Sequence, residues 1–485
     1  MKLYSENKDY KLYHGSMLDM LEVIESNSID SIVTDPPYGL TSITKRFGKE
    51  GSAPASTKNN DGSFARLSKG FMGKEWDGSG IEYNIETWQK CYEVLKPGGY
   101  LLAFGGSRTF HRIACVIEDA GFEIRDTIMW LYGSGFPKSQ NIGKMYDKKM
   151  GNEREIVGET KIGKTSLGDG SGWDTSQNMK DIKATGKIDI TKGNSKFEGW
   201  GSALKPSFEP IIVARKPFKG SLVDNVIKNG VGGINIDECR VGTETISIHN
   251  APKGTFAGGE YGRGSDTSSY RDSTGRFPAN TILTYDETDF EEVCGGFPNT
   301  KSNGGKTSMP DLRDVGKKSK KAIGIDKLSF GQVSNVERKE RNYIAPGDSG
   351  SAIRYFYCAK ASKKDRDEGL DIEESVITDG RKKPIDNAFN GGETLRKNTH
   401  PTVKPTQLMQ YLVRLVSPKG ATILDPFNGS GSTGKAVMYE NKERNKNYKY
   451  IGIELTEEYL PIAKARIEYV CGKEQQTKLD LSDLD

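Results

Sequence analysis

The sequence predicts an α/β fold around an open, Rossmann-like sheet to which both ends of the chain contribute strands. Residues 29–34 form an apolar, β-branched run that ends in Asp35-Pro36-Pro37-Tyr38. Near the other end, a strand, a glycine-rich turn, a helix start and a second strand follow one another over residues 423–454. The C-terminal piece supplies only two or three strands, too few for a stable sheet, so we expect both ends to pair.

The first strand brings an acid, two rigid carbonyls and an aromatic ring to the edge where open α/β sheets place their sites. Pro36 and Pro37 have no N–H, so this turn offers acceptors and few donors. Asp35 and a proline carbonyl can accept hydrogen bonds from an exocyclic NH2, and Tyr38 can stack on a flat ring. The turn therefore suits an amine-bearing nucleobase. A surface turn without a ligand is the alternative interpretation.

The next elements continue the alternation of strand and helix. Residues 41–80 are irregular and rich in Gly, Ser and Lys. We interpret them as a loop that closes over the site, with a disordered insertion as the alternative. A helix that stops at Pro97-Gly98, a buried strand over 100–105, a helix over 108–120 and a strand over 124–132 follow.

The middle of the chain has a different composition. Residues 139–203 and 241–350 are polar and glycine-rich, whereas 206–240 regain apolar strands that can rejoin the sheet. Basic runs at 317–321 and 338–341 offer phosphate contacts, or are solvated loops. We therefore predict a core half over 1–138, an inserted region over 139–350 and a second core half over 351–485.

Three ligands compete for the glycine-rich turn. Gly429-x-Gly431-x-x-Gly434 matches the dinucleotide fingerprint, and Gly434-Lys435 nearly completes a nucleotide-triphosphatase phosphate loop, but Ala436 lacks the hydroxyl that Mg²⁺ needs there. Glu454 suits the ribose hydroxyls of an adenosine. Asp425 would repel a pyrophosphate. Together with Phe427 it favours the sulfonium and ammonium groups of S-adenosylmethionine. We therefore predict S-adenosylmethionine, with NAD and ATP as alternatives.

Taken together, the Asp35 and Asp425 motifs resemble those of the DNA amino-methyltransferases, which methylate N6 of adenine or N4 of cytosine. The order, with the catalytic motif first, is similar to the β group of that family. Two further segments, His400-Pro401-Thr402-Val403-Lys404-Pro405 and residues 12–18, also resemble family blocks. Segments 130–138, 204–210 and 355–360 are similar to phage or prophage members.

The resemblance implies a site-specific methyltransferase that acts on N6 of adenine in double-stranded DNA after base flipping. Adenine is favoured over cytosine N4 because Asp, not Ser, opens the motif. The catalytic residues implied are Asp35, Pro36, Pro37 and Tyr38. Those implied for S-adenosylmethionine are Thr402, Lys404, Asp425, Phe427, Gly429, Gly431 and Glu454. The inserted region would be the target-recognition region, and the block at 400–405 would close one wall of the cofactor pocket.

Composition sets limits on other functions. With 70 Lys and Arg against 66 Asp and Glu, the net charge is only +4, so a nucleic-acid site must be a local patch. Six scattered cysteines and four histidines support neither a zinc cluster nor a disulfide framework, so we expect reduced thiols, no metal and a cytoplasmic location. No apolar run is long enough to span a membrane. A homodimer and a cognate restriction endonuclease are left open by the sequence.

Overall fold

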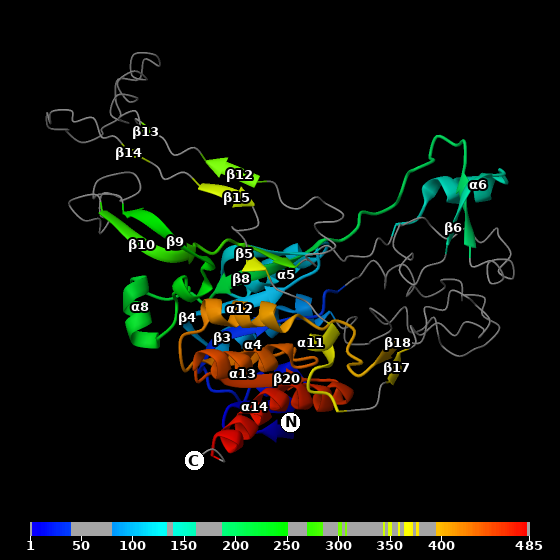
Figure 1. Ribbon diagram of the computed structural model, residues 1–485. Coiled ribbons are helices and arrows are strands. Elements are labelled where there is room, and N and C mark those ends of the chain that lie inside the picture. The colour runs from blue at the N-terminus through cyan, green and yellow to red at the C-terminus, as the bar shows by residue number, and fades with distance from the viewer. Residues whose placement is uncertain are drawn as a thin grey trace. The chain divides into compact units, whose positions relative to one another are not determined.

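The computed structural model of the protein is shown in Figure 1. It describes residues 2–39, 80–132, 139–161, 187–250, 269–284, 299–302, 306–307, 343–344, 348–351, 357–358, 363–371, 375–377 and 394–482. The chain divides into two compact units, one formed by Met1–Asp286 with Phe356–Asp485 and the other by Glu287–Tyr355. The predicted loop at 41–80, apart from residue 80, and both basic runs of the middle region lie outside the described residues.

A ten-stranded sheet organises the larger unit. Its strands follow the spatial order β1 (Lys2–Glu6), β2 (Tyr10–His14), β20 (Lys449–Glu454), β19 (Thr422–Asp425), β3 (Ile29–Thr34), β4 (Leu95–Phe104), β8 (Phe208–Arg215), β5 (Glu123–Tyr132), β11 (Thr281–Thr284) and β16 (Tyr357–Cys358). Most neighbouring strands are parallel. β8 runs antiparallel between β4 and β5, and β1 runs antiparallel to β2 at the edge. The sheet is therefore mixed, as in many α/β proteins.

The two ends of the chain meet at the centre of this sheet. β19 pairs in parallel with β3, where Ile423 lies opposite Ser31 and Leu424 opposite Ile32. β20 pairs in parallel with β2. The predicted α/β sheet built from both chain ends is therefore confirmed, and the carboxyl ends of β3, β19 and β20 lie at one edge of the sheet.

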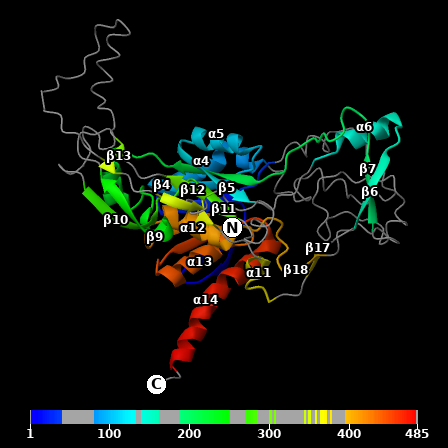
Figure 2. The same ribbon diagram turned by 45° about the horizontal axis from the view of Figure 1, so that its top comes forward.

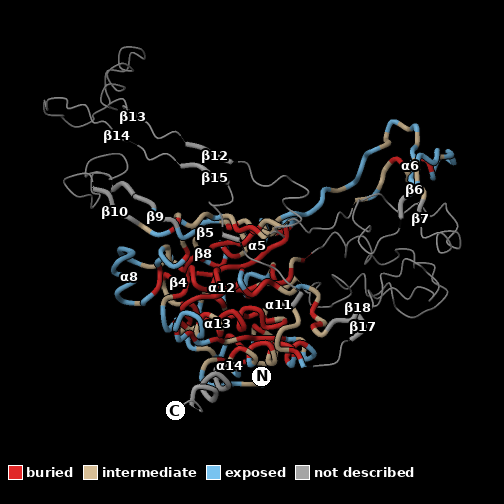
Figure 3. Tube along the Cα trace, in the orientation of Figure 1, coloured by how far each residue is buried: buried red, intermediate tan, exposed pale blue. Residues whose placement is uncertain are grey.

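Helices cover both faces of the sheet, as Figure 2 shows. The first face carries α1 (Met17–Leu21), α4 (Ile85–Val94) and α5 (Phe110–Asp119), and the other carries α12 (Thr406–Val416), α13 (Ser432–Arg444) and α14 (Leu460–Ser482). Strand β8 shows the expected period of two: Ile211 and Val213 pack toward α12 and α13, and Ile212 and Ala214 pack toward α4 and α5. Figure 3 shows that the central strands are mostly buried, whereas the helices that cover them also carry exposed residues.

A short turn precedes helix α14. Residues Glu457–Tyr459 form a short 3-10 turn, η7, and α14 starts at Leu460 with Pro461 in its first turn. A proline is tolerated there because the first N–H groups of a helix have no intrahelical partner. Helix α12 spans Thr406–Val416 and directly follows the predicted block at 400–405.

The inserted region carries smaller elements. Helix α6 (Ile142–Met150) and the hairpin of β6 (Glu155–Lys161) and β7 (Lys187–Lys192) are tied by Arg154, which forms ion pairs with Asp147 and Glu198. Helix α8 (Leu222–Asn229) follows β8, and β9 (Val241–Asn250) pairs with β10 (Ser269–Arg276). The inserted region also contains η5 (Asp237–Cys239). Outside it lie η3 (Ile81–Tyr83), α11 (Lys363–Asp367) and the pair of β17 (Ser375–Ile377) and β18 (Thr394–Arg396).

The smaller unit contains two short antiparallel pairs, β12 (Asn299–Ser302) with β15 (Asp348–Ser351) and β13 (Lys306–Thr307) with β14 (Tyr343–Ile344). The functional boundaries predicted at 139 and 350 stay predictions. Among the described residues, no helix combines the length and the apolar character that a bilayer crossing requires. Cys91, Cys115, Cys239 and Cys471 are free thiols.

Candidate active site

The turn after β3 holds the first part of the site. All six residues of β3 are buried, and Asp35 follows directly at its carboxyl end. The Thr109 hydroxyl donates to the carbonyl oxygen of Tyr38 at 2.7 Å, and the Tyr83 hydroxyl donates to the same oxygen at 3.1 Å. Tyr83 belongs to η3 (Ile81–Tyr83) and Thr109 is the N-cap residue of α5, so these two elements hold the predicted Asp-Pro-Pro-Tyr group at the sheet edge.

The carboxylate of Asp35 is only partly used. Its Oδ2 accepts from the Lys404 ammonium at 2.5 Å. Its Oδ1 is buried and has no hydrogen-bond partner among the residues that the structure describes. A buried acceptor without a donor is costly, so it marks a place where a ligand N–H gains most. Burial is also the main reason that the pKa of Asp35 is raised.

Glu209 completes this cluster, which we call the Asp35–Lys404–Glu209 cluster. It lies on β8, and its Oε2 is 3.5 Å from Lys404 Nζ and accepts from the Tyr38 hydroxyl at 2.7 Å. The sequence resemblance covered residues 204–210 but assigned Glu209 no role. The signal that could have found it is an acid inside an apolar strand, since such an acid is rarely buried without a partner.

The turn after β19 is built differently. Both oxygens of Asp425 are occupied: Oδ1 accepts from Thr34 Oγ1 at 2.6 Å and from the Phe427 N–H at 3.1 Å, and Oδ2 accepts from Thr433 Oγ1 at 2.6 Å. The side chain is buried, and burial raises the pKa of Asp425 to about 6. Asp425 therefore connects β3, the glycine-rich turn and the start of α13.

The three glycines of this turn serve close packing. Gly431 has φ +74°, and a Cβ there would lie 2.9 Å from Ala463 Cα. A Cβ on Gly434 would lie 2.6 Å from both Ile467 and Tyr450, and one on Gly429 would lie 2.9 Å from His400 Nε2. These contacts require glycine at each position. Lys435 is buried between Asp365 (2.7 Å) and Glu368 (2.9 Å), so it does not act as a phosphate-loop lysine.

Glu454, at the end of β20, lies where a ribose-binding acid is expected. Its Oε2 accepts from the Gly429 N–H and its Oε1 from the Thr456 N–H, each at 2.7 Å. These two bonds fix the orientation of the carboxylate and leave further lone pairs for a ligand. Burial raises the pKa of Glu454 to about 7.

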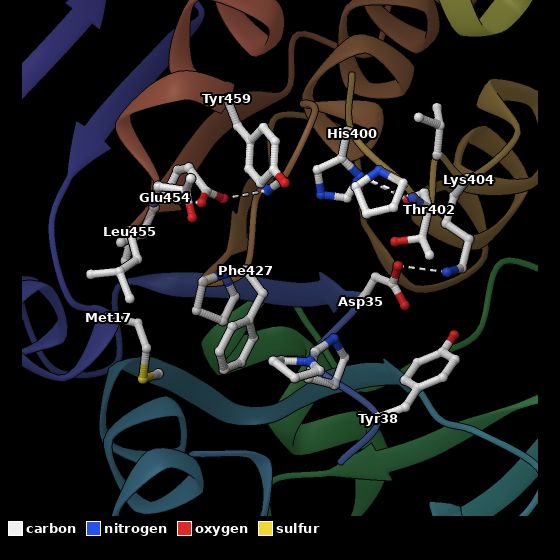
Figure 4. Close-up of a pocket in the computed structure, with 18 of the residues that line it drawn as sticks. Met17, Asp35, Tyr38, His400, Thr402, Lys404, Phe427, Glu454, Leu455 and Tyr459 are labelled. Atoms are coloured by element: carbon white, nitrogen blue, oxygen red, sulfur yellow. Dashed lines mark hydrogen bonds and ion pairs between the residues drawn. The ribbon is translucent and has the colours of Figure 1, made fainter. Parts of the chain in front are cut away.

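One cavity of about 470 Å³ joins these groups. Figure 4 shows Asp35, Tyr38, Lys404 and Thr402 at one end, and Glu454, Leu455, Met17 and Tyr459 at the other, with Phe427 between them. His400 also lines the cavity. Its ring packs edge-on against the ring of Tyr459, with 4.6 Å between the two ring centroids. Burial lowers the pKa of His400 to about 3, so the ring is neutral at pH 7.

The cavity brings together nine of the eleven predicted residues: Asp35, Pro36, Pro37, Tyr38, Thr402, Lys404, Phe427, Gly429 and Glu454. Asp425 and Gly431 are not among the residues that line it. Met17, Leu455 and Tyr459 were missed, because single apolar residues next to a turn carry no distinctive pattern. Within the described part of the chain, no group of three or more His, Cys, Asp or Glu residues could hold a metal ion.

Comparison with known proteins identifies a family model that matches this chain. A family model described as DNA methylase, N6_N4_Mtase, matches residues 29–233 and 317–465. These ranges include the turns after β3 and β19, strand β8 and the block at 400–405, so they contain both ends of the cavity.

The individual relatives that match this chain have low sequence identity to it. The chain is 26% identical over 243 residues to the type II methyltransferase M.HindIII of Haemophilus influenzae, which is 46% of this chain and 64% of that enzyme. It is 26% identical over 267 residues to M2.LlaDCHI of Lactococcus lactis subsp. cremoris, or 51% of this chain and 87% of that enzyme. The crystal structure of M1.HpyAVI aligns with a TM-score of 0.34 and 13% identity, over 94% of this chain and 98% of that one. The strand order, not this alignment, establishes the fold.

Proposed function

The chain belongs to the N6_N4 DNA methylase family, and from this premise we propose that it transfers a methyl group from S-adenosylmethionine to the exocyclic N6 of adenine in DNA. Membership confirms the resemblance to DNA amino-methyltransferases that the sequence motifs indicated, and the predicted cofactor agrees with it. The phage or prophage type, the target sequence, a homodimer and a partner endonuclease stay predictions or open questions.

The observation that carries the proposal is the buried Oδ1 of Asp35, which has no partner in the described part of the chain and lies in a cavity that also contains Glu454. An amine N–H is the donor that this oxygen lacks, and the half-buried Tyr38 ring beside it offers a face for a base. A base inside a duplex cannot reach a buried acceptor, so the target must be flipped out of the helix.

The residues at the other end of the cavity fit S-adenosylmethionine. Glu454 would accept from the ribose hydroxyls, and Met17, Phe427 and Leu455 would contact the apolar parts of the adenosine. A volume of about 470 Å³ falls in the range of ordinary small-molecule sites. When bound, the cofactor supplies an electrophilic methyl group, whose bonding electrons stay with sulfur.

The protein's own contribution is to hold and activate the amine. Asp35 Oδ1 and the Pro36 carbonyl would hold the two amine protons, which draws the nitrogen lone pair out of ring conjugation and toward the methyl group. The lone pair then forms the new N–C bond, and the proton that the nitrogen loses passes to Asp35. Positioning and electrostatics carry this chemistry, and no cysteine takes part.

Cytosine N4 is the second candidate, because an exocyclic amine in either base satisfies Asp35. We place adenine first because an aspartate opens the catalytic motif in this chain. Target recognition would belong to the inserted region at 139–350, through Lys and Arg contacts to phosphates and a few polar contacts to bases.

The direct test is nucleoside mass spectrometry of unmethylated DNA incubated with the purified protein and S-adenosylmethionine, with Asp35→Ala in parallel. We expect N6-methyladenine with the wild-type protein alone. N4-methylcytosine would keep the mechanism and overturn the choice of base. If S-adenosylhomocysteine binds but no base in genomic DNA of diverse sequence is methylated, DNA is not the acceptor and the proposal fails.

A further inference from the structure

We propose that Glu209 is a positioning residue which, by sharing the Lys404 ammonium, controls how strongly the Asp35 carboxylate attracts protons. This inference rests on the proposed function and adds a residue to it. It starts from the arrangement of the Asp35–Lys404–Glu209 cluster, in which one buried ammonium lies between two carboxylates from different elements.

The geometry makes the sharing unequal. Lys404 Nζ lies 2.5 Å from Asp35 Oδ2 and 3.5 Å from Glu209 Oε2. The Lys404 side chain is only 7% exposed, and its ammonium also faces the rings of Phe104 at 5.0 Å and Tyr38 at 5.3 Å. Burial opposes its charge, yet the two carboxylates together raise its pKa, so the group remains an ammonium.

A cluster of one cation and two anions has a net negative charge. With Asp35 alone, Lys404 would neutralise the carboxylate and weaken it as an acceptor for amine protons. The second anion, Glu209, competes for the same ammonium, and its like charge raises the pKa of Asp35. Glu209 would therefore keep Asp35 basic enough to hold the amine and to accept the proton released by methylation.

Glu209 also fixes the ring that receives the base. Its Oε2 accepts from the Tyr38 hydroxyl at 2.7 Å, and its Oε1 lies 3.4 Å from the Tyr132 hydroxyl. The same carboxylate thus sets the charge around Asp35 and the orientation of Tyr38. Any test must separate these two effects.

Other titratable groups near Asp35 are few in the described part of the chain. Asp425 lies on the neighbouring turn and interacts with Asp35 as a like charge. His400 faces Lys404 and is neutral at pH 7. Tyr38 and Tyr132 have raised pKa values, chiefly because they are buried. The variants below therefore change the charge of Lys404 or Glu209, the two charged groups that lie next to Asp35 in this cluster.

Glu209→Gln removes the charge and keeps a carbonyl oxygen for the Tyr38 hydroxyl. In the pH profile of kcat, we expect the acid limb to move to lower pH by about one unit. At the pH optimum, kcat should fall about tenfold. Affinity for S-adenosylhomocysteine should stay within about twofold. Glu209→Asp, which keeps the charge, should restore the position of the limb. Lys404→Met should move it to higher pH, since the ammonium no longer favours the ionised carboxyl.

Glu123→Gln is the matched control, because Glu123 lies on the adjacent strand β5, pairs with Arg215 of β8 and does not line the cavity. Its profile should overlay that of the wild type. The inference is overturned if Glu209→Gln lowers kcat without moving the acid limb, or if Glu209→Asp shows the same profile as Glu209→Gln. Wild-type methylation, measured in the same series, tests the proposed function separately.

Discussion

Two neighbouring turns at the sheet edge begin with the same Asp-Pro sequence and use it differently. Asp35-Pro36 follows β3 and Asp425-Pro426 follows β19, and the two strands are paired in parallel. One oxygen of Asp35 has no partner among the described residues, while both oxygens of Asp425 accept hydrogen bonds from threonine hydroxyls. One aspartate is available to a ligand, and the other holds the two turns together.

The difference lies in the neighbours. Thr34 and Thr433 provide hydroxyls that satisfy Asp425, whereas Asp35 meets an ammonium at only one oxygen. A buried carboxylate with complete hydrogen bonding contributes to structure, and one with incomplete bonding is prepared to bind. The bond from Thr34 to Asp425 also joins residues from opposite ends of the chain, so the fold of one end positions the turn of the other.

Asp35→Ala should have the largest effect on activity. Removing the acceptor for the amine should lower kcat by about 10²–10³-fold, as the loss of other preorganised groups does. The affinity for S-adenosylhomocysteine should stay close to the wild-type value, because Asp35 lies at the opposite end of the cavity from Glu454. Single-turnover methylation and calorimetric titration measure the two quantities. Asp126→Ala on β5 is the control, and a comparable loss of activity there would contradict the comparison.

Asp425→Ala should show the opposite pattern, with stability changing most. It leaves the Thr34 and Thr433 hydroxyls buried without an acceptor, which should lower the free energy of unfolding by about 1–3 kcal/mol. Urea unfolding measures this change. Asp425→Asn retains one acceptor oxygen and should lose less, and Asp425→Ala should cost less in a Thr34→Val background. If Asp425→Ala weakened S-adenosylhomocysteine binding with no loss of stability, Asp425 would be a cofactor ligand, as the sequence alone indicated.

The sequence could predict which segments meet, but not which aspartate oxygens accept hydrogen bonds from other residues. The strand at 29–34 and the pairing of both chain ends followed from the apolar β-branched run and from the shortage of C-terminal strands. The role of Asp425 did not follow, because it depends on a hydroxyl 391 positions away. The bond between the Lys404 ammonium and Asp35 did not follow either, and the predicted contact of Lys404 with the cofactor stays a prediction. Hydrogen bonds across the sheet edge depend on side-chain directions that periodicity does not encode.

Glu454 offers a smaller effect that depends on pH. Burial raises the pKa of its carboxyl to about 7, above its value in an unfolded chain. The folded state therefore binds more protons between these two pKa values, so this group favours folding at low pH and the contribution is lost as the pH rises through about 7.

Cofactor binding should respond in the opposite direction, because the ionised carboxylate is the better acceptor for ribose hydroxyls. Below the raised pKa, affinity for S-adenosylhomocysteine should fall by at most about tenfold per pH unit, measured by calorimetric titration from about pH 5.5 to about pH 8.5. Glu454→Gln should bind more weakly and lose most of this dependence, leaving a smaller change below the pKa of Asp425, which is about 6. A full pH dependence in Glu454→Gln would mean that another group controls binding. Asp425 would then be the first candidate, and it would have to be regarded as a binding acid and not as a structural one.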